Sequence, residues 1–128
     1  MKKKRTKLQI LHDKAWKIFS RYIRLRDNGK CFTCGVVGDI KIMQAGHFIH
    51  KQCLDFNEIN INCQCVFCNK WKHGNLGIYA TRLTEKYNPE ILIQLERLGN
   101  EVKKFTIKEL EEIIKRYSNR VKVLEIAH

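Results

Sequence analysis

The chain has 128 residues, the length of one ordinary domain, and 44% of them are hydrophobic, which favours a folded protein over a disordered one. Lysine and arginine number 25 against 13 aspartate and glutamate, so the net charge is +12 and an anionic partner is expected, either nucleic acid or an acidic membrane surface. No uncharged run is long enough to span a bilayer, and no apolar signal-peptide core follows the basic N-terminus, so we expect a cytoplasmic protein.

The first thirty residues carry most of the excess charge, and hydrophobic residues recur there at spacings of three and four. This pattern predicts an amphipathic helix over residues 7–27, which Asn28-Gly29 ends. A solvated tail and helix face would also explain the charge. If the partner is nucleic acid, the residues expected to contact phosphate are Lys2, Lys3, Lys4, Arg5, Lys7, Lys17, Arg21, Arg24 and Arg26.

Six cysteines follow, and four of them form two Cys-x-x-Cys pairs, Cys31 with Cys34 and Cys65 with Cys68. Four thiolates make a closed tetrahedral zinc site, so we predict a structural Zn²⁺ rather than a catalytic one. Cys53 and Cys63 lack a partner at this spacing and are expected to be buried thiols, although Cys63 is an alternative to Cys65 as a ligand. A thiol redox protein is a further alternative, because single Cys-x-x-Cys motifs also occur in such proteins.

The remaining elements are short. Residues 39–50 resemble a hairpin, because Ile40 and Ile42 alternate with polar residues, and residues 51–64 resemble an irregular loop. A knuckle and a short helix are expected over residues 65–73, then helices over 78–87 and 90–98, the second with Asn88 as its N-cap. A capping box formed by Thr106 and Glu109 begins a final amphipathic helix. Its apolar face is either core or a dimer interface.

Polar residues between and after the knuckles point to a second metal. His47 follows Gly46 at the end of a predicted strand, and Asn69 directly follows Cys68. His73 lies four positions beyond Asn69, so the two share one face of the short predicted helix. Oxygen ligands suit Mg²⁺ or Mn²⁺, and imidazole widens the range to transition metals. The alternative is a polar, solvent-exposed helix face, and His12 and His128 are expected to be surface histidines.

Together these residues resemble the HNH nucleases, also called the ββα-metal or His-Me finger superfamily. Within it, the chain is similar over roughly residues 14–117 to the NinG/Rap-like recombination endonucleases of phages. The segments that carry the resemblance are Gln44-Ala-Gly-His-Phe48, Asn60 with Gln64-Cys-Val-Phe-Cys-Asn69, and Gly74-Asn75. The expected location is then the cytoplasm of a bacterial host, with the gene on a phage or prophage.

The resemblance implies a metal-dependent DNA endonuclease that is selective for branched recombination intermediates such as D-loops and Holliday junctions. His47 would be the general base, Asn60 would steady the loop that orients it, and Asn69 would bind a catalytic Mg²⁺ or Mn²⁺. His73 is added as a ligand from helix spacing alone. Gly46 departs from the many HNH enzymes that have Asp or His before the base, and the missing ligand is then Gln44, His50, a backbone carbonyl, water or a DNA phosphate.

The fold class expected is α+β, with one domain over residues 1–128. It would comprise a basic tail and helix (1–28), a zinc-stapled HNH-like ββα-metal core (29–76) and C-terminal helices (77–128). Two alternatives stay open, a non-catalytic zinc-stabilised DNA-binding module and an HNH nuclease of little structure selectivity. A membrane partner is not expected, and a homodimer is possible because symmetric cutting of a junction needs two active sites.

Overall fold

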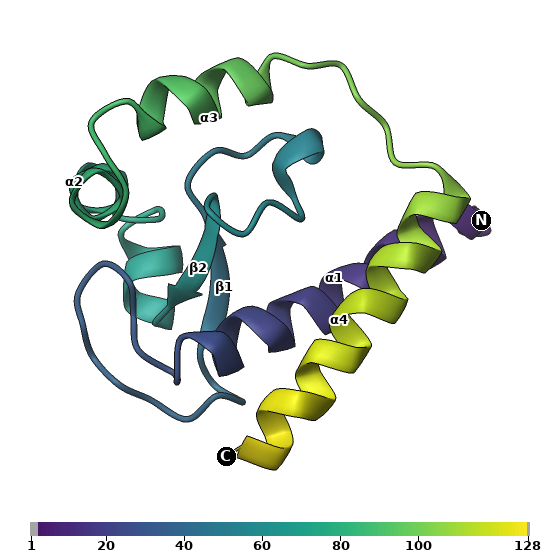
Figure 1. Cartoon of the computed structure of the whole chain (residues 1–128), viewed down its shortest axis with the longest axis horizontal. Helices are drawn as coiled ribbons and strands as arrows, with labels where there is room; N and C mark the ends of the chain where they lie inside the picture. The colour runs from purple at the N-terminus through teal and green to yellow at the C-terminus, as the bar shows by residue number, and fades with distance from the viewer. Residues whose placement is uncertain (1–2, 128) are drawn as a thin grey trace.

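The computed structural model describes residues 3–127, and Lys2 and His128 lie outside the described residues. Figure 1 shows a small two-stranded sheet beside two long helices that pack along each other, with two shorter helices on the opposite side. In chain order the elements are α1 (Lys7–Arg26), β1 (Gln44–His47), η1 (Gln52–Leu54), β2 (Ile61–Gln64), η2 (Phe67–Trp71), α2 (Leu76–Lys86), α3 (Ile91–Gly99) and α4 (Ile107–Ala127). Within residues 3–127, no helix is both long and apolar enough to cross a membrane. The α+β class is confirmed.

Helix α1 matches the helix predicted from periodicity to within one residue at its C-terminal end. The helix begins with a capping box that the sequence did not predict. Thr6 Oγ1 accepts a hydrogen bond from the Gln9 backbone N–H, and Gln9 Oε1 accepts one from the Thr6 backbone N–H. The chain turns out of the helix through Asn28 and Gly29, which have positive φ angles of 53° and 67°. These two residues direct the chain into the first knuckle.

The sheet differs from the prediction. Strand β1 pairs antiparallel with β2, with Gly46 opposite Asn62, whereas residues 39–50 form no hairpin of their own. The prediction of an irregular loop over residues 51–64 is also wrong for its last four residues, which form β2. Ile42, whose alternation with Ile40 suggested a strand, is 67% exposed. Pairing β1 with β2 instead buries Ala45 and Cys63 in the main core, which the local alternation does not reveal.

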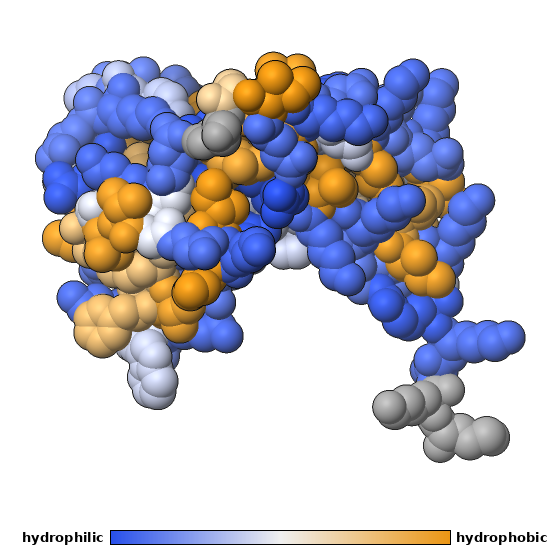
Figure 2. Space-filling model, turned by 90° about the horizontal axis from the view of Figure 1, so that it is seen from below, coloured by the Kyte–Doolittle hydropathy of each residue, from blue (hydrophilic) through white to orange (hydrophobic). Residues whose placement is uncertain are grey.

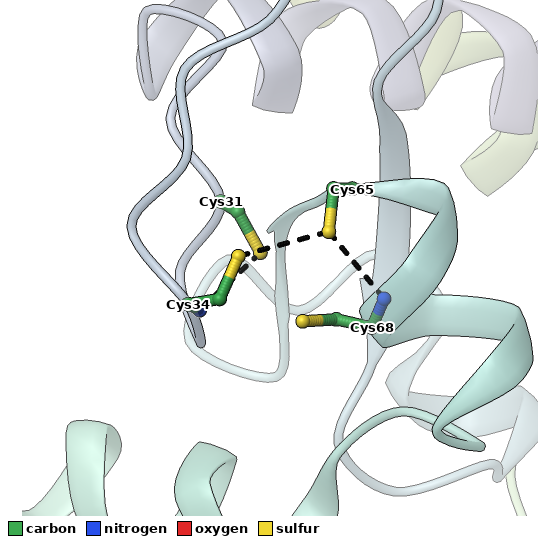
Figure 3. Close-up of side chains that lie close together, drawn as sticks. All are labelled: Cys31, Cys34, Cys65 and Cys68. Carbon is green, nitrogen blue, oxygen red and sulfur yellow. Dashed lines mark hydrogen bonds between the residues drawn. The ribbon is translucent and has the colours of Figure 1, made fainter.

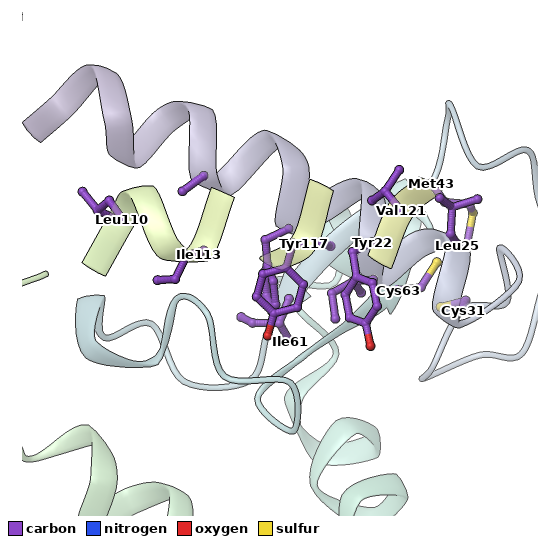
Figure 4. Packing of buried hydrophobic residues seen from close by; sticks show 14 of the residues in the cluster. Tyr22, Leu25, Cys31, Met43, Ile61, Cys63, Leu110, Ile113, Tyr117 and Val121 are labelled. Carbon is purple, nitrogen blue, oxygen red and sulfur yellow. The ribbon is translucent and has the colours of Figure 1, made fainter. Parts of the chain in front are cut away.

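The main core lies between the sheet and the two long helices. Figure 4 shows Leu110, Ile113, Tyr117 and Val121 of α4 turned towards this interior. The Phe19 ring of α1 packs edge-on against Tyr117, with ring centroids 4.8 Å apart. The apolar face of the last helix, predicted as either core or dimer interface, is therefore core in this chain.

A second, smaller core joins α2 and α3 to the loop between the strands. It contains Tyr79, Leu83, Ile91 and Leu95. Both helices were predicted to within two residues, but no side-chain hydrogen bond from Asn88 caps α3, whose N-cap is Glu90. The predicted capping box at α4 is confirmed, because Thr106 Oγ1 accepts from the Glu109 N–H at 3.1 Å and Glu109 Oε1 accepts from the Thr106 N–H at 3.0 Å.

Glu58, in the loop between the strands, ties the two long helices together. Its carboxylate accepts hydrogen bonds from Tyr22 of α1 at 2.8 Å and from Tyr117 of α4 at 2.9 Å, and Arg120 lies 2.9 Å away. Partial burial alone would raise the pKa of Glu58, but the two hydroxyl donors and Arg120 outweigh it and lower that pKa. The ionised carboxylate is thus the form that stabilises the fold.

Glu58→Gln is expected to lower the free energy of unfolding at pH 7 by about 1–2 kcal/mol, because bonds to a charged acceptor are lost. Because the pKa of Glu58 is lower in the folded state, its carboxylate stabilises the fold fully at pH values above the unfolded-state pKa of about 4.3. This stabilisation is lost as the pH falls through the folded-state pKa. The difference between wild type and variant should therefore shrink as the pH falls from 5, in urea unfolding followed by circular dichroism. Glu111→Gln, an exposed change on α4, should show no such trend.

Candidate functional site

Four cysteines from two separate segments converge on one point. The thiols of Cys31, Cys34, Cys65 and Cys68 all lie within 4.8 Å of one another, and among residues 3–127 no other group of three or more His, Cys, Asp or Glu ligand atoms lies so close. Figure 3 shows the two knuckles facing each other across this point. Cys34 Sγ and Cys65 Sγ are 3.7 Å apart, close to the roughly 3.8 Å edge of a tetrahedron with Zn–S bonds of about 2.3 Å.

The surroundings of the cluster also suit a thiolate metal site. The N–H of Cys34 donates to Cys31 Sγ at 3.5 Å, and the N–H of Cys68 donates to Cys65 Sγ at 3.4 Å. Burial opposes ionisation of Cys31, but hydrogen bonds from Cys34 and Thr33 outweigh it and lower its pKa to about 6. Burial instead raises the pKa of Cys65 to about 12. Four cysteine ligands can hold a structural metal such as zinc, and they leave no position open for catalysis.

The two remaining cysteines lie outside the cluster. Cys63 is fully buried in β2, and burial raises its pKa to about 12, as expected for a structural thiol. Cys53 Sγ lies 3.4 Å from the carbonyl oxygen of Leu98, at the edge of α3. The second knuckle is therefore formed by Cys65 rather than by the alternative, Cys63.

His47 ends β1 and is held by a carboxylate that the sequence reasoning did not find. His47 Nε2 lies 3.1 Å from Asp55 Oδ1, and the other oxygen, Asp55 Oδ2, lies 3.0 Å from His12 Nε2 of α1. The indole ring of Trp16 stacks on the His47 imidazole with centroids 4.9 Å apart, and the His50 ring stacks at 5.0 Å. His12 is consequently not a simple surface histidine, because its ring pairs with the carboxylate that orients His47.

Asn60 lies in the loop between the strands and hydrogen-bonds to the segment that follows β1. It is fully buried, and its Oδ1 accepts from the Ile49 N–H at 2.9 Å while its Nδ2 donates to the Ile49 carbonyl at 3.0 Å. A longer contact of 3.4 Å joins its Nδ2 to the Leu54 carbonyl, next to Asp55. The side chain thus fixes both ends of the segment that carries Asp55 past His47.

Asn69 lies on the other side of β1. Its Nδ2 donates to Gln44 Oε1 at 2.7 Å, and its Oδ1 would lie 3.0 Å from a Cβ atom added to Gly46. The same added Cβ would overlap Gln64 Oε1. A side chain at residue 46 would therefore clash with the carboxamides of Gln64 and Asn69, so glycine is the residue that fits there.

The helical-spacing argument for His73 is wrong. The helix that carries Asn69 is a single π-helical turn that ends at Trp71, and His73 follows it as an exposed residue with a positive φ of 50°. The tight turn through Gly74, which also has positive φ, ends the helix before it can bring His73 under Asn69. The two residues do not share a helix face.

The basic residues expected to contact phosphate fall into three groups. Arg26 donates to the backbone of Glu58 and Ile61 and pairs with Asp27, and Arg24 donates to the Ile40 carbonyl, so both hold the fold together. Arg5 pairs with Asp13 and Arg21 with Glu125 on the surface. Among the residues expected to contact phosphate, the exposed lysines that form no ion pair within residues 3–127 are Lys3, Lys4, Lys7 and Lys17.

Comparison with known proteins identifies the family. Residues 1–126 match the family described as Bacteriophage Lambda NinG protein. The chain belongs to the NinG family. It is 33% identical over 114 residues to protein ninG of Escherichia phage lambda, covering 86% of this chain and 55% of that protein, and 31% identical to protein ninG of Salmonella phage P22, with the same coverage of each. The chain thus spans about half the length of these relatives. No solved structure matches it.

Within this NinG-family chain, sequence reasoning missed Asp55, His12 and Gln64. Asp55 and His12 lie 8 and 35 positions from His47, and Gln64 lies 18 positions from Gly46, so no local spacing joins them. One signal was available for Gln64, because a glycine directly before a histidine at a strand end marks a close approach by another group. None was available for Asp55, whose loop was not assigned a conformation.

Proposed function

We propose that this NinG-family chain is a metal-dependent DNA endonuclease of the HNH type. The observation that carries the proposal is His47 at the end of β1, with its imidazole fixed between Asp55 and Trp16. A buried, satisfied core histidine would need no such arrangement of carboxylate and stacked ring around a partly exposed imidazole. The four-cysteine cluster supports the proposal because its second knuckle leads directly into η2, the helix that carries Asn69.

In the proposed mechanism His47 accepts a proton from the attacking water. When Nε2 carries the ring proton and donates to Asp55, the lone pair of Nδ1 is free to act as the base. Asp55 is a positioning residue, since it holds the ring in one orientation and one tautomer, and Asn60 holds the loop that carries Asp55. A neutral imidazole suits this role near pH 7.

Asn69 is the proposed protein ligand of the catalytic cation. Its carboxamide oxygen is a hard donor of the kind that Mg²⁺ and Mn²⁺ bind. A bound Mg²⁺ would supply charge stabilisation for the scissile phosphate and the leaving 3′ oxygen. The expected products carry a 5′ phosphate and a 3′ hydroxyl.

A nicking assay tests the function. The zinc-loaded protein should convert supercoiled plasmid to the open circle in the presence of Mg²⁺ and not in EDTA. A non-catalytic DNA-binding module, which is the competing function, would shift the mobility of the plasmid without breaking either strand. That result with His47 and Asn69 intact would overturn the proposal.

We further propose that the DNA is branched and that an aromatic pair on η2 recognises it. Trp71 is 75% exposed and Phe67 59% exposed, so neither serves as core packing. Lys70 and Lys72 are exposed beside them, and the Lys72 ammonium lies 5.4 Å from the Phe67 ring centroid. Seen from below, the molecule has hydrophobic side chains gathered on the left, with a hollow between them and the mainly hydrophilic right (Figure 2). Exposed aromatics among lysines suit unstacked bases and their phosphates.

Trp71→Ala is expected to weaken binding to a four-way junction by about tenfold, because one base–aromatic stack is worth about 1–3 kcal/mol. Affinity for linear duplex should change little, since its bases stay stacked. Fluorescence anisotropy with both DNAs in EDTA measures this without cleavage, and Val123→Ala, an exposed change on α4, is the control. Equal losses on both DNAs would leave an HNH nuclease of little structure selectivity.

A homodimer with two active sites is part of the proposal for symmetric cutting, and sedimentation of the junction complex tests it.

A further inference from the structure

A buried amide oxygen without a partner lies beside Gly46, directly before His47. Within residues 3–127, Gln64 Oε1 is the one buried side-chain polar atom that forms no hydrogen bond. The whole Gln64 side chain is inaccessible to solvent. Leaving such a group unsatisfied costs about 1–3 kcal/mol, so its place in the fold calls for a partner from outside the chain.

The orientation of this amide is fixed by its other end. Gln64 Nε2 donates to Thr33 Oγ1 at 3.2 Å and to the Gly74 carbonyl at 2.8 Å. Exchanging the amide oxygen and nitrogen would place the oxygen against the Gly74 carbonyl, where two acceptors would repel. The oxygen therefore faces Gly46.

A second amide oxygen faces the same point. Asn69 Nδ2 donates to Gln44 Oε1, which turns Asn69 Oδ1 towards Gly46. A Cβ on residue 46 would overlap Gln64 Oε1 and lie 3.0 Å from Asn69 Oδ1, so only glycine leaves both oxygens in place. Asn69 is partly exposed whereas Gln64 is not, so an ion shared by the two oxygens is open to water and phosphate only on the Asn69 side.

We propose that Gln64 Oε1 and Asn69 Oδ1 together bind a Mg²⁺ ion beside Gly46. Gln64 then supplies from β2 the ligand that a side chain at residue 46 would otherwise supply from β1. Mg²⁺ prefers oxygen ligands in octahedral geometry and keeps several waters, so two protein oxygens are enough to place it next to phosphate. Because both ligands are neutral, the ion alone binds weakly, and the remaining positions go to water and DNA phosphate. This inference rests on the proposed nuclease function, in which Asn69 is already a ligand.

The first test follows the two amide carbonyls in the unmodified, zinc-loaded chain. In a Mg²⁺ titration followed by ¹³C NMR, the side-chain carbonyl resonances of Gln64 and Asn69 should shift together and saturate. Those of Asn60 and Asn62, which are buried and fully hydrogen-bonded, should stay in place. Two results would overturn the proposal: a shift at Asn69 without one at Gln64, or no shift at either, which would leave water as the partner of Gln64.

The second test is a gain in affinity. Gln64→Glu places a carboxylate at the site and should tighten Mg²⁺ binding by about tenfold, because ligand charge sets the affinity of such sites. Gln94→Glu adds the same charge at an exposed position of α3 and should leave the affinity within about twofold. Equal effects of the two substitutions would show that Gln64 is not a ligand. If Gln64→Glu does not fold, the carbonyl shifts in the unmodified chain still decide.

The two proposals fail differently. Mg²⁺-dependent nicking without a response at Gln64 would retain the nuclease and reject this ligand. Saturable shifts at both carbonyls in a protein that cuts no DNA would retain the metal site and reject the nuclease.

Discussion

His47→Ala is expected to lower the rate of Mg²⁺-dependent DNA cleavage by about 10²–10⁴-fold, the usual contribution of a general base. Binding to the same DNA should be nearly unchanged, because the exposed lysines that we expect to contact phosphate lie on the N-terminal tail and α1. Single-turnover nicking at saturating protein measures the first quantity, and anisotropy in EDTA measures the second. Cleavage at the wild-type rate would show that another group activates the water.

Asp55→Asn distinguishes a positioned base from an isolated histidine. The amide keeps the size of the side chain but no longer holds His47 as a charged acceptor, so kcat should fall while KM stays close to the wild-type value. The ¹⁵N resonances of the His47 ring should also show a change in tautomer, which a purely structural role would not cause. Asp39→Asn, at an exposed turn where the carboxylate accepts from the Lys41 N–H, is the matched control and should change neither quantity.

Cys68→Ser is expected to abolish folding of the knuckle region at neutral pH. The structural zinc in small domains contributes on the order of 10 kcal/mol, comparable to the whole stability of a domain of this size. The two strands and η2 bury too little apolar surface to stay in place without it. Metal analysis should give about one zinc per chain for wild type and much less for the variant, with loss of cooperative thermal unfolding.

Cys53→Ser is the control for this prediction. Its thiol lies outside the cluster and donates to backbone carbonyls at the end of α3, so zinc content and unfolding temperature should change little. Chelation of the wild-type protein should reproduce the effect of Cys68→Ser. A wild-type protein that stays folded and free of metal would show that the four thiols are not a zinc site.

Helices and knuckles were predictable because their determinants are close in sequence. Hydrophobic spacing predicted α1 to within one residue, and the Thr106–Glu109 capping box predicted the start of α4. The two Cys-x-x-Cys pairs likewise predict a thiolate site, because each pair forms a complete local turn. In such elements the residues that interact are at most four positions apart.

The strand partner and the surroundings of His47 were not predictable in this way. Local alternation at Ile40 and Ile42 suggested a hairpin. Instead β1 pairs with a strand that begins 14 positions after β1 ends, and burial against α1 decides the match. The same distant pairing brings Gln64 to Gly46, and the turn at Gly74 removes His73 from the helix that spacing had assigned to it.

The sequence by itself determined the charge, the helices, the four-cysteine cluster and the family. Only the tertiary structure decided which groups surround His47 and Gly46. It placed Asp55 between two histidines and turned Gln64 Oε1 and Asn69 Oδ1 towards Gly46. It also placed Arg24 and Arg26 in hydrogen bonds to backbone carbonyls, where they stabilise the fold. The physical reason is that hydrogen-bond partners of buried polar groups are chosen by packing among segments distant in sequence, which no local pattern records.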